Sequence, residues 1–533
     1  MSEQSFEMIA KTFQGLEEVL AQELTALGAN DIEIGRRMVS FSGDKEMMYK
    51  ANFCLRTAIR ILKPIKHFTA KDADEVYDQI KAIHWEDHLD TGKTFAVDAV
   101  VFSEEFRHSK FVSYKVKDAI VDYFREQSGE RPSVRINKPD VLLNIHIAET
   151  KCTLSLDSSG ESLHRRGYRQ EAVEAPLNEV LAAGMILMTG WNGECDLIDP
   201  MCGSGTIPVE AALIARNIAP GVFRKEFAFE KWIDFDQTIF DNLYNDDSQE
   251  REFTHKIYGY DNSPKANEIA THNIKAAGVS KDIVLKLQPF QQFEQPEAKS
   301  MIITNPPYGE RISTNDLLGL YSMIGERLKH AFAGNTAWVL SYREECFDQI
   351  GLKPTQKIPL FNGALECEFR QYEIFDGKYK EFRESGDELN KESREYKPAS
   401  RERGDRREFK PRERREFGGE KREFGGEKRE FRPRERREFK EGERREFKPR
   451  ERREFGGEKR EFGGEKREFR PRERRDFKEG ERREFKPRER REFGGEKREF
   501  KPRERGEFGG EHRTRSGESY PERKRREAGK KED

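Results

Sequence analysis

The amino-acid composition changes abruptly near Asp376, and this change limits which part of the chain can form a packed core. Residues 376–533 consist almost wholly of Arg, Lys, Glu, Gly and regularly spaced Phe, with almost no Ile, Leu or Val. Such a segment cannot bury enough apolar surface to offset the entropy lost on ordering. We therefore expect a folded part at 1–375 and a disordered Arg/Glu/Phe/Gly repeat tail at 376–533.

The tail repeats a 38-residue unit, in which Arg-Arg-Glu-Phe-Lys-Pro begins at Arg406, Arg444 and Arg482. One apolar residue per seven or eight positions is too few for a coiled-coil seam, and the Gly-Gly pairs and prolines break helices. The tail holds 57 Lys and Arg against 44 Asp and Glu, a formal charge of +13, whereas the whole chain carries −2. This asymmetry suggests a basic arm that tethers a polyanion such as RNA; an inert spacer is the alternative.

Cysteine usage and hydropathy exclude several classes of protein. The six cysteines lie far apart with no CxxC pair, which argues against a structural zinc site and a disulfide framework. The first residues do not have the pattern of a signal peptide, and no stretch of about 18 apolar residues occurs. We expect a cytoplasmic, soluble protein that binds neither metal nor membrane.

A strand, a glycine turn and a helix start are predicted at 196–206. Glycines permit positive φ and close approach of a ligand, and a helix start offers unpaired N–H groups. A dinucleotide fingerprint is disfavoured, because its third glycine would fall at Pro208 and no acidic residue ends a strand about 20 residues later. The residues of the predicted cofactor turn are Asp199, Pro200, Cys202, Gly203, Gly205 and Thr206.

An acidic residue ends the next predicted strand, at 256–261. The carboxylate of Asp261, followed by Asn262, could accept both hydroxyls of a ribose at the carboxyl end of a strand. Taken alone, Asp261 would more simply cap the helix that begins near Pro264. Its combination with the glycine turn favours a site for a nucleoside-containing cofactor.

The segment Asn305-Pro306-Pro307-Tyr308 directly follows the apolar run 301–304. A carboxamide, two prolines with fixed φ and an aromatic ring are thereby presented at the end of a buried strand. This arrangement suits the holding of an amine, and we predict these four residues as the catalytic segment. An ordinary loop that ends a strand is the alternative.

Together, the glycine turn and the Asn-Pro-Pro-Tyr segment resemble the class I S-adenosylmethionine-dependent methyltransferases that modify exocyclic amines of nucleobases. The resemblance implies S-adenosylmethionine as the cofactor, with Asp199 and the glycine turn at its methionine part and Asp261 at its ribose. Gln288 occupies the adenine-contacting position, where the family often has Asp. On the catalytic side, the resemblance implies that Asn305 and the Pro306 carbonyl accept the amine hydrogens.

Residues 170–375 alternate predicted strands and helices, which is typical of a doubly wound, mostly parallel sheet. The predicted strands are 196–199, 256–261, 283–287, 301–304 and 336–341, and the predicted helices are 206–218, 264–277 and 317–332. An antiparallel edge hairpin is predicted at 365–375. We expect a Rossmann-like class I methyltransferase domain at 161–375.

The front part of the chain, with strands and helices over 1–160, resembles a ferredoxin-like module (1–60) followed by the THUMP module of RNA-modifying enzymes (61–160). The resemblance rests on residues 113–122 and 157–169. It implies RNA binding, and the clustered basic and aromatic side chains suit phosphate contact and base stacking. A solvated linker is the alternative for 164–169. The predicted RNA-binding residues are Lys110, Lys115, Lys117, Arg165, Arg166, Tyr168 and Arg169.

The string from Asn305 to Arg311, together with the THUMP-like part, is similar to the 23S ribosomal RNA guanine-N2 methyltransferases of the large subunit. The resemblance implies ribosomal RNA as substrate and the precursor of the large ribosomal subunit as partner. Three alternatives stay open: a transfer-RNA guanine-N2 methyltransferase, a nucleic-acid adenine-N6 methyltransferase, and a non-catalytic RNA chaperone or ribosome assembly factor.

Overall fold

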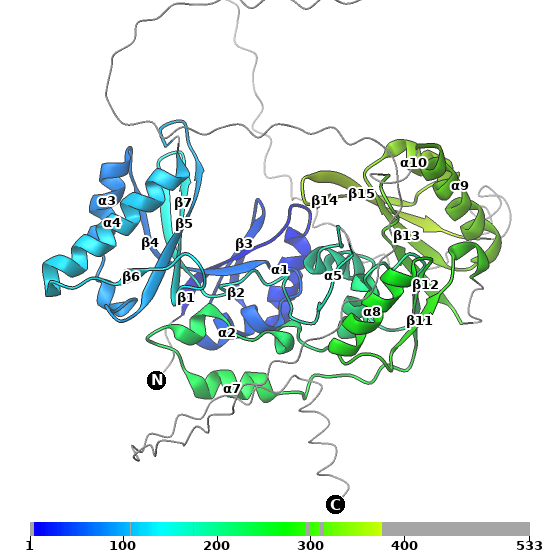
Figure 1. Cartoon of the computed structure of the whole chain (residues 1–533), viewed down its shortest axis with the longest axis horizontal. Helices are drawn as coiled ribbons and strands as arrows, with labels where there is room; N and C mark the ends of the chain where they lie inside the picture. The colour runs from blue at the N-terminus through cyan, green and yellow to red at the C-terminus, as the bar shows by residue number, and fades with distance from the viewer. Residues whose placement is uncertain (1–4, 107, 174, 294–297, 310–313, 376–533) are drawn as a thin grey trace, which may run out of the picture. The chain divides into compact units, whose positions relative to one another are not determined.

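Two β-sheets, each covered by helices, make up the residues that the structure describes (Figure 1). The computed structural model describes residues 5–106, 108–173, 175–293, 298–309 and 314–375, which all belong to one compact unit. The predicted tail at 376–533 lies outside the described residues. In the described part of the chain, no helix is long and apolar enough to cross a membrane.

The first sheet joins the predicted ferredoxin-like and THUMP modules. Within the described residues it has eight strands in the order β2-β3-β1-β4-β8-β7-β5-β6. Strand β4 pairs with β1 on one side and with β8 on the other, so the predicted boundary at residue 60 falls at the start of a shared strand. The strands are β1 (Phe6–Lys11), β2 (Asn30–Gly35), β3 (Met38–Gly43), β4 (Arg60–Thr69), β5 (Thr94–Phe102), β6 (Ser133–Val134), β7 (Val141–Ala148) and β8 (Lys151–Asp157).

Helices α3 and α4 of this part are amphipathic and bury one face each, whereas α2 is buried around most of its surface. Helices α3 and α4 pack side by side against the sheet, where Val76 and Ile80 of α3 and Val116 and Ile120 of α4 are fully buried (Figure 1). The helices are α1 (Glu17–Leu27), α2 (Lys45–Cys54), α3 (Ala73–Lys81) and α4 (Ser109–Ser128).

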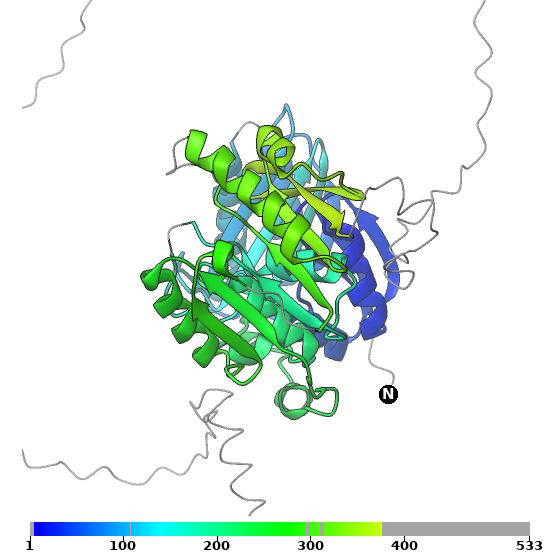
Figure 2. The same cartoon turned by 90° about the vertical axis from the view of Figure 1, so that its right-hand side faces the viewer.

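The second sheet has seven strands within the described residues, in the order β11-β10-β9-β12-β13-β15-β14. Figure 2 views the protein from the side on which this sheet lies in Figure 1. Strands β11 to β13 are parallel and β15 runs antiparallel to β13. The strands are β9 (Asp196–Asp199), β10 (Ile257–Asp261), β11 (Ile283–Leu287), β12 (Ser300–Thr304), β13 (Thr336–Ser341), β14 (Gln356–Asn362) and β15 (Leu365–Glu373). The helices are α5 (Glu179–Met188), α6 (Thr206–Ala215), α7 (Gln237–Asn245), α8 (Pro264–Ala276), α9 (Thr314–Ala331) and α10 (Glu344–Ile350).

Helices cover both faces of the second sheet because successive strand residues point to opposite sides. Leu197 of β9 packs in a core that includes α5, α6 and α8. Its neighbour Ile198 packs in a separate core with α9 and α10. The predicted doubly wound α/β domain is thereby confirmed, but the edge hairpin is formed by β14 with β15 rather than within 365–375.

The long segment between α6 and β10 attaches the domain to the N-terminal module. It contributes α7 and a set of aromatic rings around α2. The Tyr49 ring stacks on Phe229 at 4.4 Å, and the Asp236 N–H donates a hydrogen bond to the Tyr49 hydroxyl at 3.0 Å. Stacked and edge-on rings of this kind add to the stabilisation from apolar burial.

Candidate active site at the strand ends

A cavity of about 740 Å³ lies at the carboxyl ends of β9, β10 and β12. The glycine turn after β9, Asp261 at the end of β10 and the segment from Asn305 to Tyr308 after β12 all line it. From β9 the chain adds β10 and β11 on one side of the sheet and then β12 and β13 on the other. Doubly wound sheets bind ligands at such a switch point, which here lies between β9 and β12. Two motifs about 100 residues apart in the sequence therefore face one cavity.

The glycine turn has the conformation that its sequence predicts. Gly203 and Gly205 have φ of +53° and +80°, and Gly205 caps the N-terminus of α6. A Cβ on Gly203 would meet nothing nearer than a Val173 methyl at 3.9 Å, so this part of the turn faces open space. The turn residues Asp199, Pro200, Cys202, Gly203 and Thr206 line the cavity.

The Asp261 carboxylate joins the turn to the neighbouring strand. The Gly203 N–H donates to one of its oxygens at 2.9 Å and the Ser263 N–H to the other at 2.8 Å. Backbone donors therefore fix the orientation of this half-buried carboxylate at the cavity wall. Asn262 beside it is exposed and also lines the cavity.

Asp199 is an unusual carboxyl group because it is 1 % exposed and, among the residues that the structure describes, no cationic side chain is one of its charge contacts. Burial raises the pKa of Asp199 to about 8, and the Asp261 carboxylate contributes to the rise. The Met201 N–H donates to Asp199 at 3.3 Å. A positive charge in the cavity would favour the ionised form of Asp199.

The Asn-Pro-Pro-Tyr segment contributes all four of its residues to the cavity wall. The Tyr308 hydroxyl donates a hydrogen bond to the side-chain oxygen of Asn305. The Tyr308 ring meets the Tyr342 ring edge-on, with centroids 5.5 Å apart. Burial raises the pKa of Tyr308, which therefore stays neutral. Glu310 and Arg311, which extend the motif in the sequence, lie outside the described residues.

Gln288 does not line the cavity. Its side-chain amide donates instead to the backbone carbonyl of Gln292 at 2.6 Å. Pro289, Phe290 and Gln291 form that part of the wall. This placement corrects the predicted cofactor contact by Gln288, because the turn after β11 folds its amide back onto the chain.

The cavity also has walls that were not predicted. Asn362 and Leu365 belong to the β14–β15 hairpin, and the others come from α9 and from the segment before α5. Only the Asn-Gly pair at Asn362, a hairpin signal, could have indicated one of them from sequence. The unpredicted lining residues include Val173, Leu177, Asp316, Leu320, Met323, Asn362 and Leu365.

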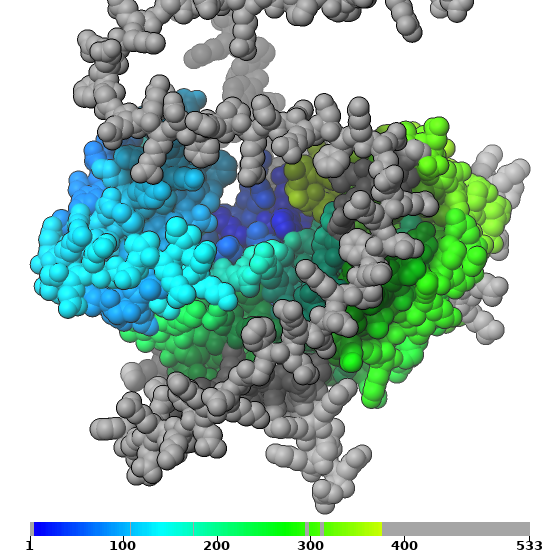
Figure 3. All heavy atoms as spheres, in the orientation of Figure 1, coloured from blue at the N-terminus to red at the C-terminus, as the bar shows by residue number. Residues whose placement is uncertain are grey.

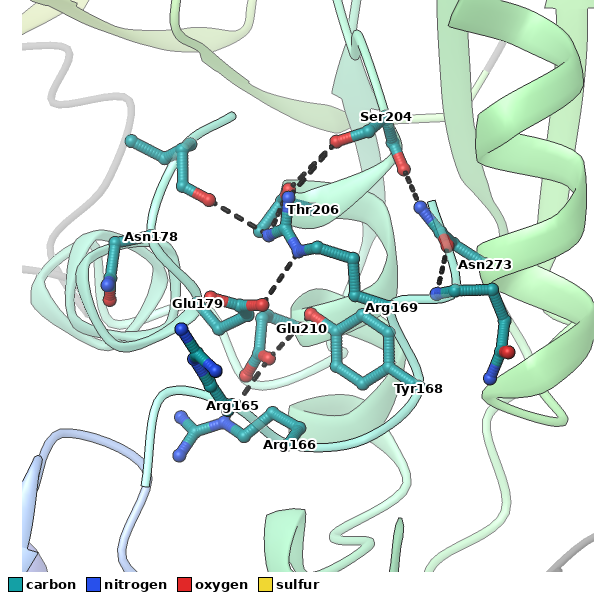
Figure 4. Close-up of polar contacts among 12 residues, drawn as sticks. Arg165, Arg166, Tyr168, Arg169, Asn178, Glu179, Ser204, Thr206, Glu210 and Asn273 are labelled. Carbon is teal, nitrogen blue, oxygen red and sulfur yellow. Dashed lines mark hydrogen bonds and ion pairs between the residues drawn. The ribbon is translucent and has the colours of Figure 1, made fainter. Parts of the chain in front are cut away.

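Arg166 and Tyr168, predicted to contact RNA, are both 2 % exposed and pack inside the protein (Figure 4). The Tyr168 hydroxyl donates to Glu210 of α6 at 2.8 Å, and the Arg166 Nε lies 3.5 Å from the same carboxylate oxygen. Gly167 between them has φ of +111°, and a Cβ there would lie 2.2 Å from the Phe223 carbonyl oxygen. The predicted RNA contact by these two residues is therefore corrected to a structural role.

Arg169 lies behind the glycine turn rather than on an RNA-facing surface (Figure 4). Its guanidinium donates to Glu179 at 2.7 Å, to Ser204 at 3.3 Å and to Thr206 at 3.0 Å. A fourth bond, to the Leu177 carbonyl at 2.9 Å, holds the segment before α5. This residue therefore supports the turn, which corrects its predicted RNA contact.

Asn273 of α8 holds the same segment from the other side (Figure 4). Its side-chain oxygen accepts from the Gln170 N–H at 2.9 Å, and its amide nitrogen donates to the Ser204 carbonyl at 3.0 Å. Thus Arg169 and Asn273 together fix the chain segment that includes the lining residues Val173 and Leu177.

The other predicted RNA-binding residues lie on the surface. Arg165 has 66 % of its side chain exposed and pairs with Glu161 at 2.7 Å. Lys110 is exposed on α4, which belongs to the cyan surface in Figure 3. Lys115 and Lys117 pair with Asp74 and Asp118 at 2.5 Å each. Surface ion pairs are weak, so these cations can exchange partners.

Comparison with protein families finds three consecutive matches. Residues 7–62 match the RlmL ferredoxin-like domain, residues 70–157 the THUMP domain, and residues 166–371 the RMKL-like methyltransferase domain. The matches follow the order expected from the sequence.

Two curated relatives are named ribosomal RNA large subunit methyltransferase K/L. The protein of Syntrophotalea carbinolica is 40 % identical over 380 residues and that of Marinomonas sp. 39 % over 378. Each match covers 69 % of this chain but only 53 % and 52 % of the relative, so the chain spans about half the length of these relatives. The slr0064 protein of Synechocystis, named as a candidate RNA methyltransferase, is 38 % identical with 69 % of this chain and 96 % of its own covered.

Solved structures agree with these matches. SMU.472, described as a candidate methyltransferase complexed with SAH, superposes with a TM-score of 0.64 at 30 % identity and covers 70 % of this chain and 100 % of its own. A methylase predicted to be specific for N6 of adenine in DNA, from Listeria monocytogenes, gives 0.63 at 31 %, covering 70 % and 97 %.

Proposed function

This chain belongs to the RMKL-like methyltransferase family, and from that premise we propose that it transfers the methyl group of S-adenosylmethionine to the exocyclic N2 of a guanine in 23S ribosomal RNA. The observation that carries the proposal is the single cavity shared by the glycine turn and the Asn-Pro-Pro-Tyr segment. A methyl donor and an amine acceptor must lie within reach of each other. The glycine turn would bind the donor, and the Asn-Pro-Pro-Tyr segment would bind the acceptor.

The residues of the cavity fit S-adenosylmethionine. Asp199 offers a buried carboxyl to a positively charged ligand, Gly203 leaves open space for close approach, and Asp261 has the acceptor oxygens for a ribose. When bound, the cofactor supplies an electrophilic methyl group on a positively charged sulfur. Asp199, Gly203 and Asp261 would bind and orient it, because they line the same wall.

On the acceptor side, an exocyclic amine is a poor nucleophile because its lone pair is delocalised into the ring. The side-chain oxygen of Asn305 and the carbonyl of Pro306 accept its two hydrogens and so orient the nitrogen. Positioning of this kind can contribute about 7–11 kcal/mol in favourable cases, and acceptors fixed before the reaction stabilise the developing positive charge. No dedicated strong base is required.

Tyr308 would stack on the extruded base, a contact worth about 1–3 kcal/mol, which offsets part of the few kcal/mol that unstacking requires. The side chains of Lys110, Lys115, Lys117 and Arg165 at the surface would contact RNA phosphates. The precursor of the large ribosomal subunit as partner and a cytoplasmic location belong to the same proposal.

Methylation of adenine N6 in DNA is the second candidate, favoured by the description of the Listeria relative. The Asn-Pro-Pro-Tyr segment alone suits either amine. The THUMP match at 70–157 favours RNA over DNA. A transfer-RNA substrate and a purely non-catalytic role are the remaining alternatives.

The experiment is methyl transfer from labelled S-adenosylmethionine to ribosomal RNA, transfer RNA and DNA taken from a strain that lacks the protein. The nucleosides are then separated and identified by mass spectrometry. The proposal expects N2-methylguanosine in 23S RNA alone. Label in transfer RNA or in adenine would establish an alternative, and no calorimetric binding of the cofactor would establish a non-catalytic role.

A further inference from the structure

We propose that Asn362 recognises the target base by pairing with the N1–H and O6 of guanine. This inference rests on the function proposed above and goes beyond it, because it names the side chain that distinguishes guanine from other purines with an exocyclic amine. It starts from the cavity wall contributed by the β14–β15 hairpin, which no motif in the sequence had assigned.

The hairpin fixes the position of Asn362. Only Gly363 and Ala364 separate the two strands, and Gly363 has a φ of +65°, as two-residue hairpin turns require. Asn362 and Leu365 are the pair directly opposite each other at this turn. Side chains of opposite residues lie on the same face of a sheet, and both of these line the cavity. The turn therefore presents an amide and an apolar group together.

Asn362 lines the same cavity as the catalytic segment. Tyr308 of that segment also lines it, and its hydroxyl donates to the side-chain oxygen of Asn305. One cavity therefore holds both the amide of Asn362 and the group that would hold the reacting amine. The edge of a purine would extend from the first amide toward the second.

The chemistry of the amide matches one base. With N2 of guanine at Asn305, the next groups along the same edge of the base are N1–H, a donor, and O6, an acceptor. An amide offers one acceptor and two N–H donors, so Asn362 can bond to both groups at once. Adenine with its N6 at Asn305 would instead present N1, an acceptor, followed by a C–H.

The apolar neighbour strengthens this discrimination. Leu365, the opposite member of the hairpin pair, lines the cavity beside the amide. A site built to hydrogen-bond a ligand rejects analogues that leave its buried polar groups unpaired. Asn362 therefore acts as a specificity residue, whereas Asn305 and Pro306 orient whichever amine is bound.

The test compares guanosine with 2-aminopurine riboside at the methylated position of a short RNA hairpin. 2-Aminopurine keeps the amine but lacks N1–H and O6. Wild type is expected to prefer guanosine by about 10- to 100-fold in kcat/KM, which corresponds to the net free energy of two hydrogen bonds. In Asn362→Ala this ratio is expected to fall toward one, while the calorimetric affinity for S-adenosylmethionine stays unchanged.

Glu366→Gln, an exposed change in the same hairpin, is the control and should keep the wild-type ratio. If Asn362→Ala fails to fold, Asn362→Leu keeps a side chain of similar size but removes both the acceptor and the donor, and it should also lose preference for guanosine. Equal losses on both RNAs, with the ratio preserved, would overturn the inference while leaving the proposed function standing. No transfer by wild type to either RNA would refute the proposed function itself, and the inference with it.

Discussion

The hydroxyl of Tyr308 donates a hydrogen bond to the side-chain oxygen of Asn305, the same atom that would accept a hydrogen from the target amine. The oxygen of Asn305 therefore already has a hydrogen-bond partner within the protein before the base arrives. A base that enters the cavity must displace the hydroxyl or share the oxygen with it. Both residues line the wall that faces the glycine turn, so this exchange takes place beside the cofactor site.

Replacement of Tyr308 separates its ring from its hydroxyl. Tyr308→Phe keeps the ring and removes the hydrogen bond to Asn305. We expect kcat/KM for RNA within about threefold of wild type, because a hydrogen bond that the target amine replaces contributes little net free energy. Tyr308→Ala removes the stacking platform, and kcat/KM should fall about 5- to 150-fold. Steady-state kinetics on the RNA substrate measure both. If Tyr308→Phe impairs activity as much as Tyr308→Ala, the hydroxyl and not only the ring is needed for methyl transfer, which contradicts the stacking role proposed for Tyr308.

The pKa of Asp199, raised by burial to about 8, makes folding stability depend on pH. Between about pH 4 and 8 the folded state keeps a proton that the unfolded chain has lost, so the stability contributed by this group falls as pH rises through that window. Asp199→Asn removes the dependence. The variant should gain stability relative to wild type, on the order of a few kcal/mol at pH 8.5 and little at pH 4.

Thermal melts of both proteins at pH 4, 6 and 8.5 measure this difference. Asp98→Asn, an exposed change on β5, serves as the control. A constant gap between Asp199→Asn and wild type would show that Asp199 is already ionised in the folded protein.

Cofactor affinity should also depend on pH. A positively charged ligand binds best when Asp199 is ionised, so binding below the raised pKa must release a proton. We expect the affinity of wild type for S-adenosylmethionine to rise from pH 6 to pH 7.5, with proton release visible as a buffer-dependent heat in calorimetry. Asp199→Asn should bind weakly at both values. An affinity that does not change with pH in wild type would contradict this role of Asp199.

The two neighbouring arginines Arg165 and Arg169 should have separate effects. Arg169→Ala removes the bonds to Glu179, Ser204 and Thr206 and should weaken cofactor binding on the order of 10-fold or more. Arg165→Ala removes an exposed cation, so RNA affinity should fall and the salt dependence of RNA binding should decrease by about one unit of slope. Calorimetry with the cofactor and RNA binding at several salt concentrations distinguish the two. Reversed effects would contradict both assignments.

Local patterns predicted much of the fold and part of the site. Asp199, the glycine turn, Asp261 and the Asn305 segment each lie at the end of a strand that its own residues specify, so their convergence followed from the sheet. Asn362 and Leu365 reach the cavity only through hairpin pairing and packing of the whole domain, which no short stretch encodes. Arg166 and Tyr168 were misplaced for a similar reason, because their partner Glu210 lies more than 40 residues away.

The most direct test of the shared cavity measures cofactor binding and methyl transfer on one variant, Asn305→Ala. The account predicts that S-adenosylmethionine binds it with nearly wild-type affinity by calorimetry, because the glycine turn is untouched. Transfer of labelled methyl to RNA should fall about 100- to 1,000-fold, the loss expected when one group aimed at developing charge is removed. Wild-type turnover by Asn305→Ala would show that Asn305 does not hold the target amine and would contradict the proposal of a shared cavity for methyl donor and acceptor.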